Sequence, residues 1–135
     1  MGHLANASLV KTTVQLTGSA DGFLTAKALP MLGKEGRILA IKIREDATDD
    51  QATDAVFYIA DDDLGDAPDD LDVFYESASV SLAGSATTAS LEDALSVPAP
   101  YCVAAVGDVK LGCNITAGGA GDTTLDVVVY AEVWC

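Results

Sequence analysis

The segment Tyr101–Thr116, YCVAAVGDVKLGCNIT, has the most regular pattern in this 135-residue sequence. Apolar residues occupy every second position before and after Gly107-Asp108. Such alternation is typical of strands with one face on a core, because successive side chains point to opposite faces of a sheet. A two-residue loop that begins with glycine predicts a hairpin with a type II′ turn. In that register Cys102 faces Cys113, so we expect two thiols close together on a buried face. We favour packed thiols over a disulfide, since the chain has an odd number of cysteines, three.

The same period of two recurs through the rest of the chain. Val10–Leu16 alternates in this way, Phe23–Leu29 is a second predicted strand that stops at Pro30, Gly36–Arg44 alternates again, and Thr123–Trp134 is the last and longest run. Ala55–Ala60 is continuously apolar, which predicts a strand covered on both sides, at the centre of a sheet or beneath an oligomer contact. Eight or nine strands joined by turns, with little helix, predict an all-β fold, an antiparallel β-sandwich of jelly-roll type.

The third of these runs separates apolar from basic side chains. Strict alternation places Leu39, Ile41 and Ile43 on the core face, and Lys42 and Arg44 on the opposite face. We therefore expect this strand to carry positive charge on its outer side.

Length and composition predict one soluble domain. A chain of 135 residues with 50% hydrophobic and 21% charged residues can bury a core of its own, so we expect a single domain over residues 1–135, with residues 1–7 as a flexible arm. No apolar run approaches the roughly 18 to 20 residues that a membrane-spanning helix needs. The N-terminus lacks the pattern of a secretory signal, which favours synthesis in the cytoplasm.

The net charge of −14 is unevenly distributed along the chain. Residues 1–44 contain six Lys or Arg, whereas residues 45–109 contain sixteen acidic residues and no Lys or Arg. We interpret the acidic stretches Glu45–Asp54 and Asp61–Asp72 as exposed loops. An acidic surface repels phosphate backbones, so nucleic-acid binding is not expected. Strong acidity suits a protein that is soluble at high concentration, or one from a high-salt organism.

Residues for catalysis are scarce. The only histidine is His3, so Ser-His-Asp and Cys-His arrangements lack a base, and we expect neither an enzyme nor a bound cofactor. Asp61, Asp63 and Asp66 could supply oxygen ligands to calcium, but they lack the spacing and the closing Glu of an EF-hand loop. A solvated acidic surface is the preferred interpretation of these carboxylates.

Three segments resemble the small β-sandwich proteins that decorate, or cement, the capsids of tailed bacteriophages. They are GRILAIKI at Gly36–Ile43, AVGDVKL at Ala105–Leu111 and AGGAGDTTLDVVVYAEV at Ala117–Val133. The resemblance is one of pattern over about two thirds of the chain, and a shared fold does not by itself fix a function. It implies a virion structural protein that binds the outer capsid surface between capsomers and stabilises the head. The implied partner is the major capsid protein, and the implied assembly is a trimer.

The charge pattern suggests how such a protein could attach. We expect the basic residues of the first third to face the capsid: Lys11, Lys27, Lys34, Arg37, Lys42 and Arg44. Aromatic anchors for oligomer contacts are expected at Phe57, Tyr58 and Trp134. Two alternatives remain open: another virion component of the tail, fibre or head-tail region, and a carbohydrate-binding β-sandwich, which the scarcity of aromatic residues disfavours.

Overall fold

A computed structural model of the chain describes residues 8–18, 22–50, 52–61, 73–81, 88–90, 99–117 and 123–134, with backbone only at 45–50, 52–53, 88–90, 117 and 123. The predicted flexible arm, residues 1–7, lies outside the described residues. No helix in the described part of the chain is long and apolar enough to span a membrane.

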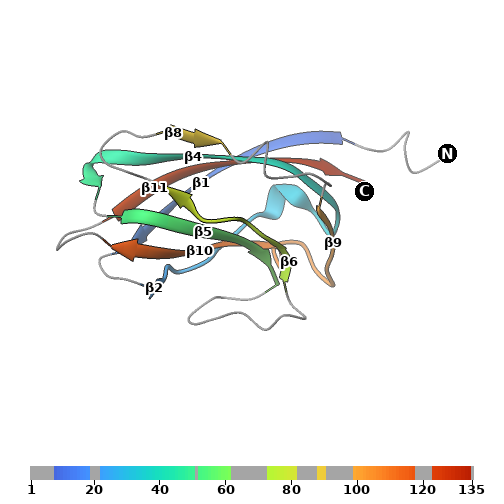
Figure 1. Ribbon diagram of the computed structural model, residues 1–135. Coiled ribbons are helices and arrows are strands. Elements are labelled where there is room, and N and C mark those ends of the chain that lie inside the picture. The colour runs from blue at the N-terminus through green and yellow to red at the C-terminus, as the bar shows by residue number, and fades with distance from the viewer. Residues whose placement is uncertain are drawn as a thin grey trace.

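Two antiparallel sheets form the molecule (Figure 1). The first sheet has the order β1 (Ser8–Gly18), β11 (Thr123–Val133), β4 (Glu35–Asp50) and β8 (Thr88–Ser90), and β9 (Ala99–Cys102) also pairs with β4. The second sheet has the order β2 (Gly22–Phe23), β10 (Lys110–Ala117), β5 (Ala52–Ala60) and β6 (Val73–Glu76). In that sheet β3 (Lys27–Ala28) also pairs with β10, and β7 (Val80–Ser81) with β5. A short 3-10 turn, η1 (Pro30–Leu32), precedes β4.

The strand order is that of a jelly roll. Strands β2 and β3 both pair with β10, β6 and β7 both pair with β5, and β8 and β9 both pair with β4. If each of these three pairs is counted as one interrupted strand, the eleven strands of the described residues reduce to eight. Numbered along the chain, the eight lie in the order 1-8-3-6 in one sheet and 2-7-4-5 in the other, which is the jelly-roll order. The predicted all-β sandwich is therefore confirmed.

The core lies between the two sheets. The inward side chains of the central strands are completely buried, among them Ile41 of β4, Val127 of β11, Leu111 of β10 and Phe57 of β5. Complete burial of such a side chain contributes about 1.5–3 kcal/mol each, so contact between the sheets is the main force that holds the sandwich together. The continuous apolar run Ala55–Ala60 lies in β5 at the centre of the second sheet, as predicted.

A β-bulge in β4 changes the predicted facing of its side chains. The pairing of β4 with β11 skips Leu39, which is an extra residue on its strand. As a result Ile38 and Ile41 are both completely buried, whereas Leu39 is half-buried, so the prediction that Leu39 faces the core is wrong. The bulge has a second consequence. Strict alternation would turn Arg37 inward, but the extra residue returns it to the outer face with Lys42.

The hairpin predicted for Tyr101–Thr116 is also wrong. The chain does turn there, because the Asp108 N–H donates to the Ala105 carbonyl at 3.2 Å and Gly107 has φ of 93°. However, Cys102 ends β9 in the first sheet, and Lys110 begins β10 in the second. The turn thus links two sheets that face one core. The alternation also gave the first of these strands the wrong face, because Tyr101 is buried there, whereas Cys102 and Val106, which the hairpin would turn inward, are exposed.

The first acidic stretch is largely strand and not loop. Strand β4 continues to Asp50, where it still pairs with β11, and β5 begins at Ala52. The prediction of an exposed loop over Glu45–Asp54 is therefore wrong in its extent, because the backbone of this stretch pairs with β11 as far as Asp50 and β5 begins at Ala52. Within the second stretch only Asp61 is described, and the rest of Asp61–Asp72 lies outside the described residues.

Candidate functional site

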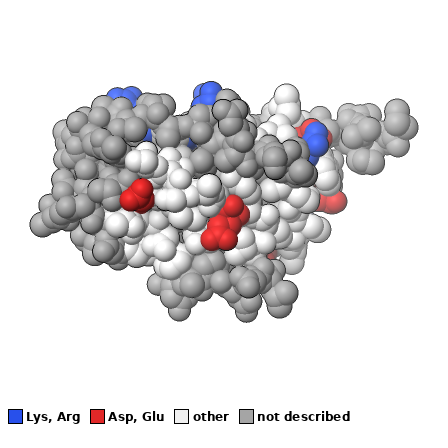
Figure 2. All heavy atoms as spheres, in the orientation of Figure 1, with Lys and Arg blue, Asp and Glu red and all other residues white. Residues whose placement is uncertain are grey.

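Four of the six predicted contact residues share one surface of the molecule. Lys11 of β1 and Arg37, Lys42 and Arg44 of β4 all lie on the side of the first sheet that faces away from the core. We call these four residues the basic face. In Figure 2 the visible Lys and Arg atoms lie along the edge of the molecule that the first sheet forms in Figure 1, whereas most visible Asp and Glu atoms lie below it.

The other two predicted contact residues lie elsewhere. Lys27 is exposed on β3 of the second sheet, and Lys34 is exposed in the link between η1 and β4. The structure therefore brings together four of the six residues that the sequence grouped by charge alone.

Strand register places the last strand, β11, across the middle of the basic face. Tyr130 pairs with Lys11 on one side and with Ala40 on the other. The Nζ atom of Lys42 lies 5.6 Å from the centre of the Tyr130 ring, within the range of a cation–π interaction. One aromatic ring thus supports a basic side chain at the centre of this surface.

Two carboxylates, Asp126 and Glu132, reduce the positive charge of the basic face. Asp126 accepts a hydrogen bond from Gln15 Nε2 at 3.1 Å and pairs across strands with Arg44. Asp126 and Arg44 also line a shallow hollow of about 370 Å³, together with Thr13, Lys42, Ile43 and Val128. The hollow offers two cationic groups and one carboxylate to a partner.

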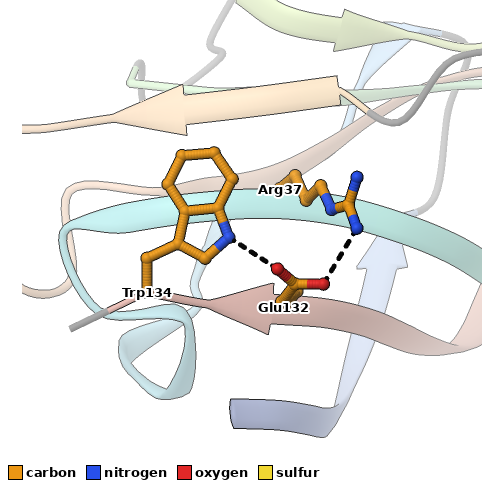
Figure 3. A network of polar contacts seen from close by, with 3 residues as sticks. All are labelled: Arg37, Glu132 and Trp134. Atoms are coloured by element: carbon orange, nitrogen blue, oxygen red, sulfur yellow. Dashed lines mark hydrogen bonds and ion pairs between the residues drawn. The ribbon is translucent and has the colours of Figure 1, made fainter. Parts of the chain in front are cut away.

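A polar network occupies one end of the same face (Figure 3). Arg37 Nη2 donates to Glu132 Oε2 at 2.9 Å, and the Trp134 indole Nε1 donates to Glu132 Oε1 at 2.9 Å. The hydrogen bond from Arg37 and then that from Trp134 lower the pKa of Glu132. Since both carboxylate oxygens accept a bond, the network fixes the direction of the indole ring.

The three residues predicted to make oligomer contacts differ in their exposure. Phe57 is completely buried in the core, so the prediction that it contacts another chain is wrong. Tyr58 lies on the outer side of the second sheet but is 9% exposed, with its ring 5.8 Å from that of Phe23. Burial, followed by the nearby Glu76 carboxylate, raises the pKa of Tyr58. Trp134 is half-buried and accessible at the end of the first sheet.

The two thiols expected to face each other lie in different sheets. Cys102 is exposed on β9, opposite Glu35, and Cys113 is buried on β10, opposite Phe57. Both thiols are free, but the predicted facing pair is wrong because Cys102 is exposed and not on the buried face, and its strand belongs to a different sheet from that of Cys113. Burial raises the pKa of the Cys113 thiol strongly.

Metal-ligating side chains do not cluster among the residues that the structure describes. Within them, no group of three or more His, Cys, Asp or Glu side chains could hold a metal ion. Of the calcium candidates, Asp61 is exposed, and Asp63 and Asp66 lie outside the described residues, as does His3.

Sequence reasoning missed the residues that β11 adds to the face. Asp126, Tyr130 and Glu132 alternate with the buried Val127, Val129 and Ala131, so the pattern could have placed them on an outer surface. What it could not supply was the pairing of β11 between β1 and β4.

A viral capsid chain is among the solved structures that this chain resembles. The sequence matches no protein-family model and no curated protein. Among solved structures, a chain of the "Cyanophage Pam1 capsid asymmetric unit" is similar to this one at 18% sequence identity and a TM-score of 0.48. The similarity covers 95% of this chain and 85% of that chain.

Proposed function

We propose that this chain is a virion structural protein of a tailed bacteriophage, without catalytic activity, that binds the outer surface of the capsid and stabilises the head. The basic face is the surface that contacts the shell. The observation that carries the proposal is the gathering of Lys11, Arg37, Lys42 and Arg44 on one sheet face of a chain whose net charge is −14.

The architecture agrees with this role. Jelly rolls are the common fold of viral capsid domains and also of lectins, and they provide a rigid sheet surface without requiring a catalytic centre. Segregated charge orients such a protein, because the basic face is attracted to an acidic shell while the remaining acidic surface is repelled from it.

The proposed partner is the major capsid protein at the joints between capsomers. A trimer on a local symmetry axis is the assembly that the sequence resemblance implies, and three copies would present three basic faces to the shell. Light scattering measures the mass in solution and tests the trimer directly.

Co-sedimentation with empty heads, purified from the virus that encodes the chain, tests attachment. We expect binding at a fixed stoichiometry that weakens as salt rises above about 0.1 M, where charges more than roughly 10 Å apart are screened. Arg44→Glu should weaken binding about three- to tenfold, because it reverses one charge at a contact that is partly screened by solvent. Lys27→Glu makes the same charge change on the second sheet and is the matched control.

Three results would contradict the proposal. Heads that sediment without the protein would contradict the proposed attachment, and so would head binding that does not weaken as salt rises. Equal losses of head binding for Arg44→Glu and Lys27→Glu would show that binding depends on the net charge of the protein and not on the basic face. Sedimentation with purified tails in place of heads would assign the chain to the tail or fibre.

A further inference from the structure

A second hollow lies at the end of the first sheet, beside the Arg37–Glu132–Trp134 network. It has a volume of about 320 Å³, which is sufficient for one large side chain. Its lining is mostly aromatic and apolar and comes from both sheets: Glu35, Phe74, Pro100, Tyr101, Cys102 and Trp134.

Backbone pairing brings the wall of this hollow together. The Trp134 N–H donates to the Glu35 carbonyl at 3.0 Å, and Glu35 pairs with Cys102 on the other side. Three neighbouring strands therefore place Trp134, Glu35 and Cys102 in one row, and side chains opposite one another in such a row lie about 4.5–5.5 Å apart at Cβ. Phe74 of the second sheet completes the wall, with its ring 6.4 Å from that of Tyr101 at 60°.

The polar groups of the two largest rings are bonded within the chain. The Trp134 indole N–H is held by Glu132, as Figure 3 shows, and the Tyr101 hydroxyl donates to the Leu32 carbonyl. Neither group needs a bond from a ligand. The rings are thus fixed in advance, and a bound group would meet apolar surface together with the carboxylate of Glu35.

An aromatic wall with one carboxylate suits a planar cation. A guanidinium group stacks on aromatic faces and can form two parallel hydrogen bonds with a carboxylate, whereas an ammonium group acts as a compact point charge. Lys and Arg are absent from the described lining residues, and the net charge of −14 favours the approach of a cation. A sugar would need several polar partners around its ring, and this hollow offers one carboxylate.

We propose that this hollow binds an arginine side chain of a partner protein, with the guanidinium stacked against Trp134 and paired with Glu35. The inference goes beyond the proposed function, since it concerns a different set of residues from the basic face. Arg44→Glu, which changes the basic face away from the Arg37–Glu132–Trp134 network, should leave arginine binding in this hollow unchanged.

Trp134 is the only tryptophan of the chain, so its fluorescence reports on the hollow directly. The probe is N-acetyl-arginine amide, and N-acetyl-lysine amide and a methyl glycoside serve as comparison ligands. We expect a saturable change of emission with the arginine probe, several-fold weaker binding of the lysine probe, and no saturation with the glycoside.

Glu35→Gln should weaken binding of the arginine probe about tenfold, because it removes a charge-assisted pair. Asp61→Asn removes the same charge at an exposed site outside the hollow and should leave the binding unchanged. Thermal unfolding of both variants verifies that they fold.

The proposal is overturned if the lysine and arginine probes bind equally, or if Glu35→Gln binds as the wild type does. Saturation by the glycoside alone would overturn it in favour of carbohydrate binding. Loss of head binding in Arg44→Glu does not bear on these outcomes, so the two proposals fail separately.

Discussion

Tyr101 fills the space that a side chain on Gly36 would need. A Cβ atom at Gly36 would lie 2.6 Å from the Tyr101 hydroxyl oxygen and would also meet the Glu132 carbonyl oxygen of the neighbouring strand. Gly36 and Tyr101 are direct partners in the pairing of β4 with β9. Position 36 therefore requires glycine, because only a residue without a side chain lets the Tyr101 ring lie across it and its hydroxyl reach the Leu32 carbonyl.

Gly36→Ala should therefore destabilise the protein by about 2–3 kcal/mol, the cost of overpacking a filled site. Gly107→Ala is the comparison. Gly107 has open space around it but a φ of 93°, so its cost is conformational and should be about 1 kcal/mol. Urea unfolding measures both. A smaller loss for Gly36→Ala than for Gly107→Ala would contradict the packing at Gly36.

The core side chain Phe57 tests how strongly contact between the sheets supports the fold. It is completely buried in the central strand of the second sheet, so Phe57→Ala should cost about 3–5 kcal/mol through lost burial and the cavity left behind. Val106→Ala removes apolar atoms at a position that is 58% exposed and should change the free energy of unfolding by less than about 0.5 kcal/mol. Similar denaturation midpoints for the two variants would be incompatible with the buried position of Phe57.

The sequence predicted the fold class because alternation reports burial directly. It marks which side chains of a strand face the core, and the two sheets share one core, so the strands of both sheets show the same signal. Alternation carries no information on the neighbour of a strand. For that reason the pattern of Tyr101–Thr116 favours a hairpin, although its two strands belong to different sheets, and Cys102 and Val106, which that hairpin turns inward, are exposed.

The basic face was predictable in part for a related reason. Lys42 and Arg44 lie on the face that alternation gave them, but the position of Arg37 depends on the bulge at Leu39. A bulge adds one residue without altering composition, so nothing in GRILAIKIR distinguishes it from a regular strand. Lys11 joins the β4 residues only because β11 pairs between β1 and β4. That pairing depends on contacts between residues far apart in the sequence.

The two described cysteines should differ sharply in reactivity. Cys102 is exposed, whereas Cys113 is buried and has a strongly raised pKa, and only the thiolate reacts with alkylating reagents. In a Cys135→Ser background, we expect iodoacetamide to modify Cys102 at least about a hundredfold faster than Cys113 under native conditions.

Peptide mass mapping after timed quenching measures the two rates, and the same reaction in denaturant serves as the control. Both thiols should then react at similar rates, because burial no longer distinguishes them. Equal rates in the native protein would place Cys113 outside the core.

The last prediction concerns acid stability and the Glu132 network. The hydrogen bonds from Arg37 and Trp134 lower the pKa of Glu132 from its ordinary value near 4.5, so the folded state favours the ionised carboxylate. A carboxyl group with a lowered folded pKa stabilises the fold fully above its unfolded pKa, and this contribution is lost as the pH falls through the folded pKa. Wild-type protein should therefore unfold at a higher urea concentration than Glu132→Gln at about pH 7, and the gap should narrow towards about pH 3. Glutamine keeps the size of the side chain and one acceptor for the indole but not the charge, so the narrowing isolates the ionised group. A gap that stays constant from neutral to acid pH would mean that the network stabilises the fold by packing alone and that its charge does not contribute.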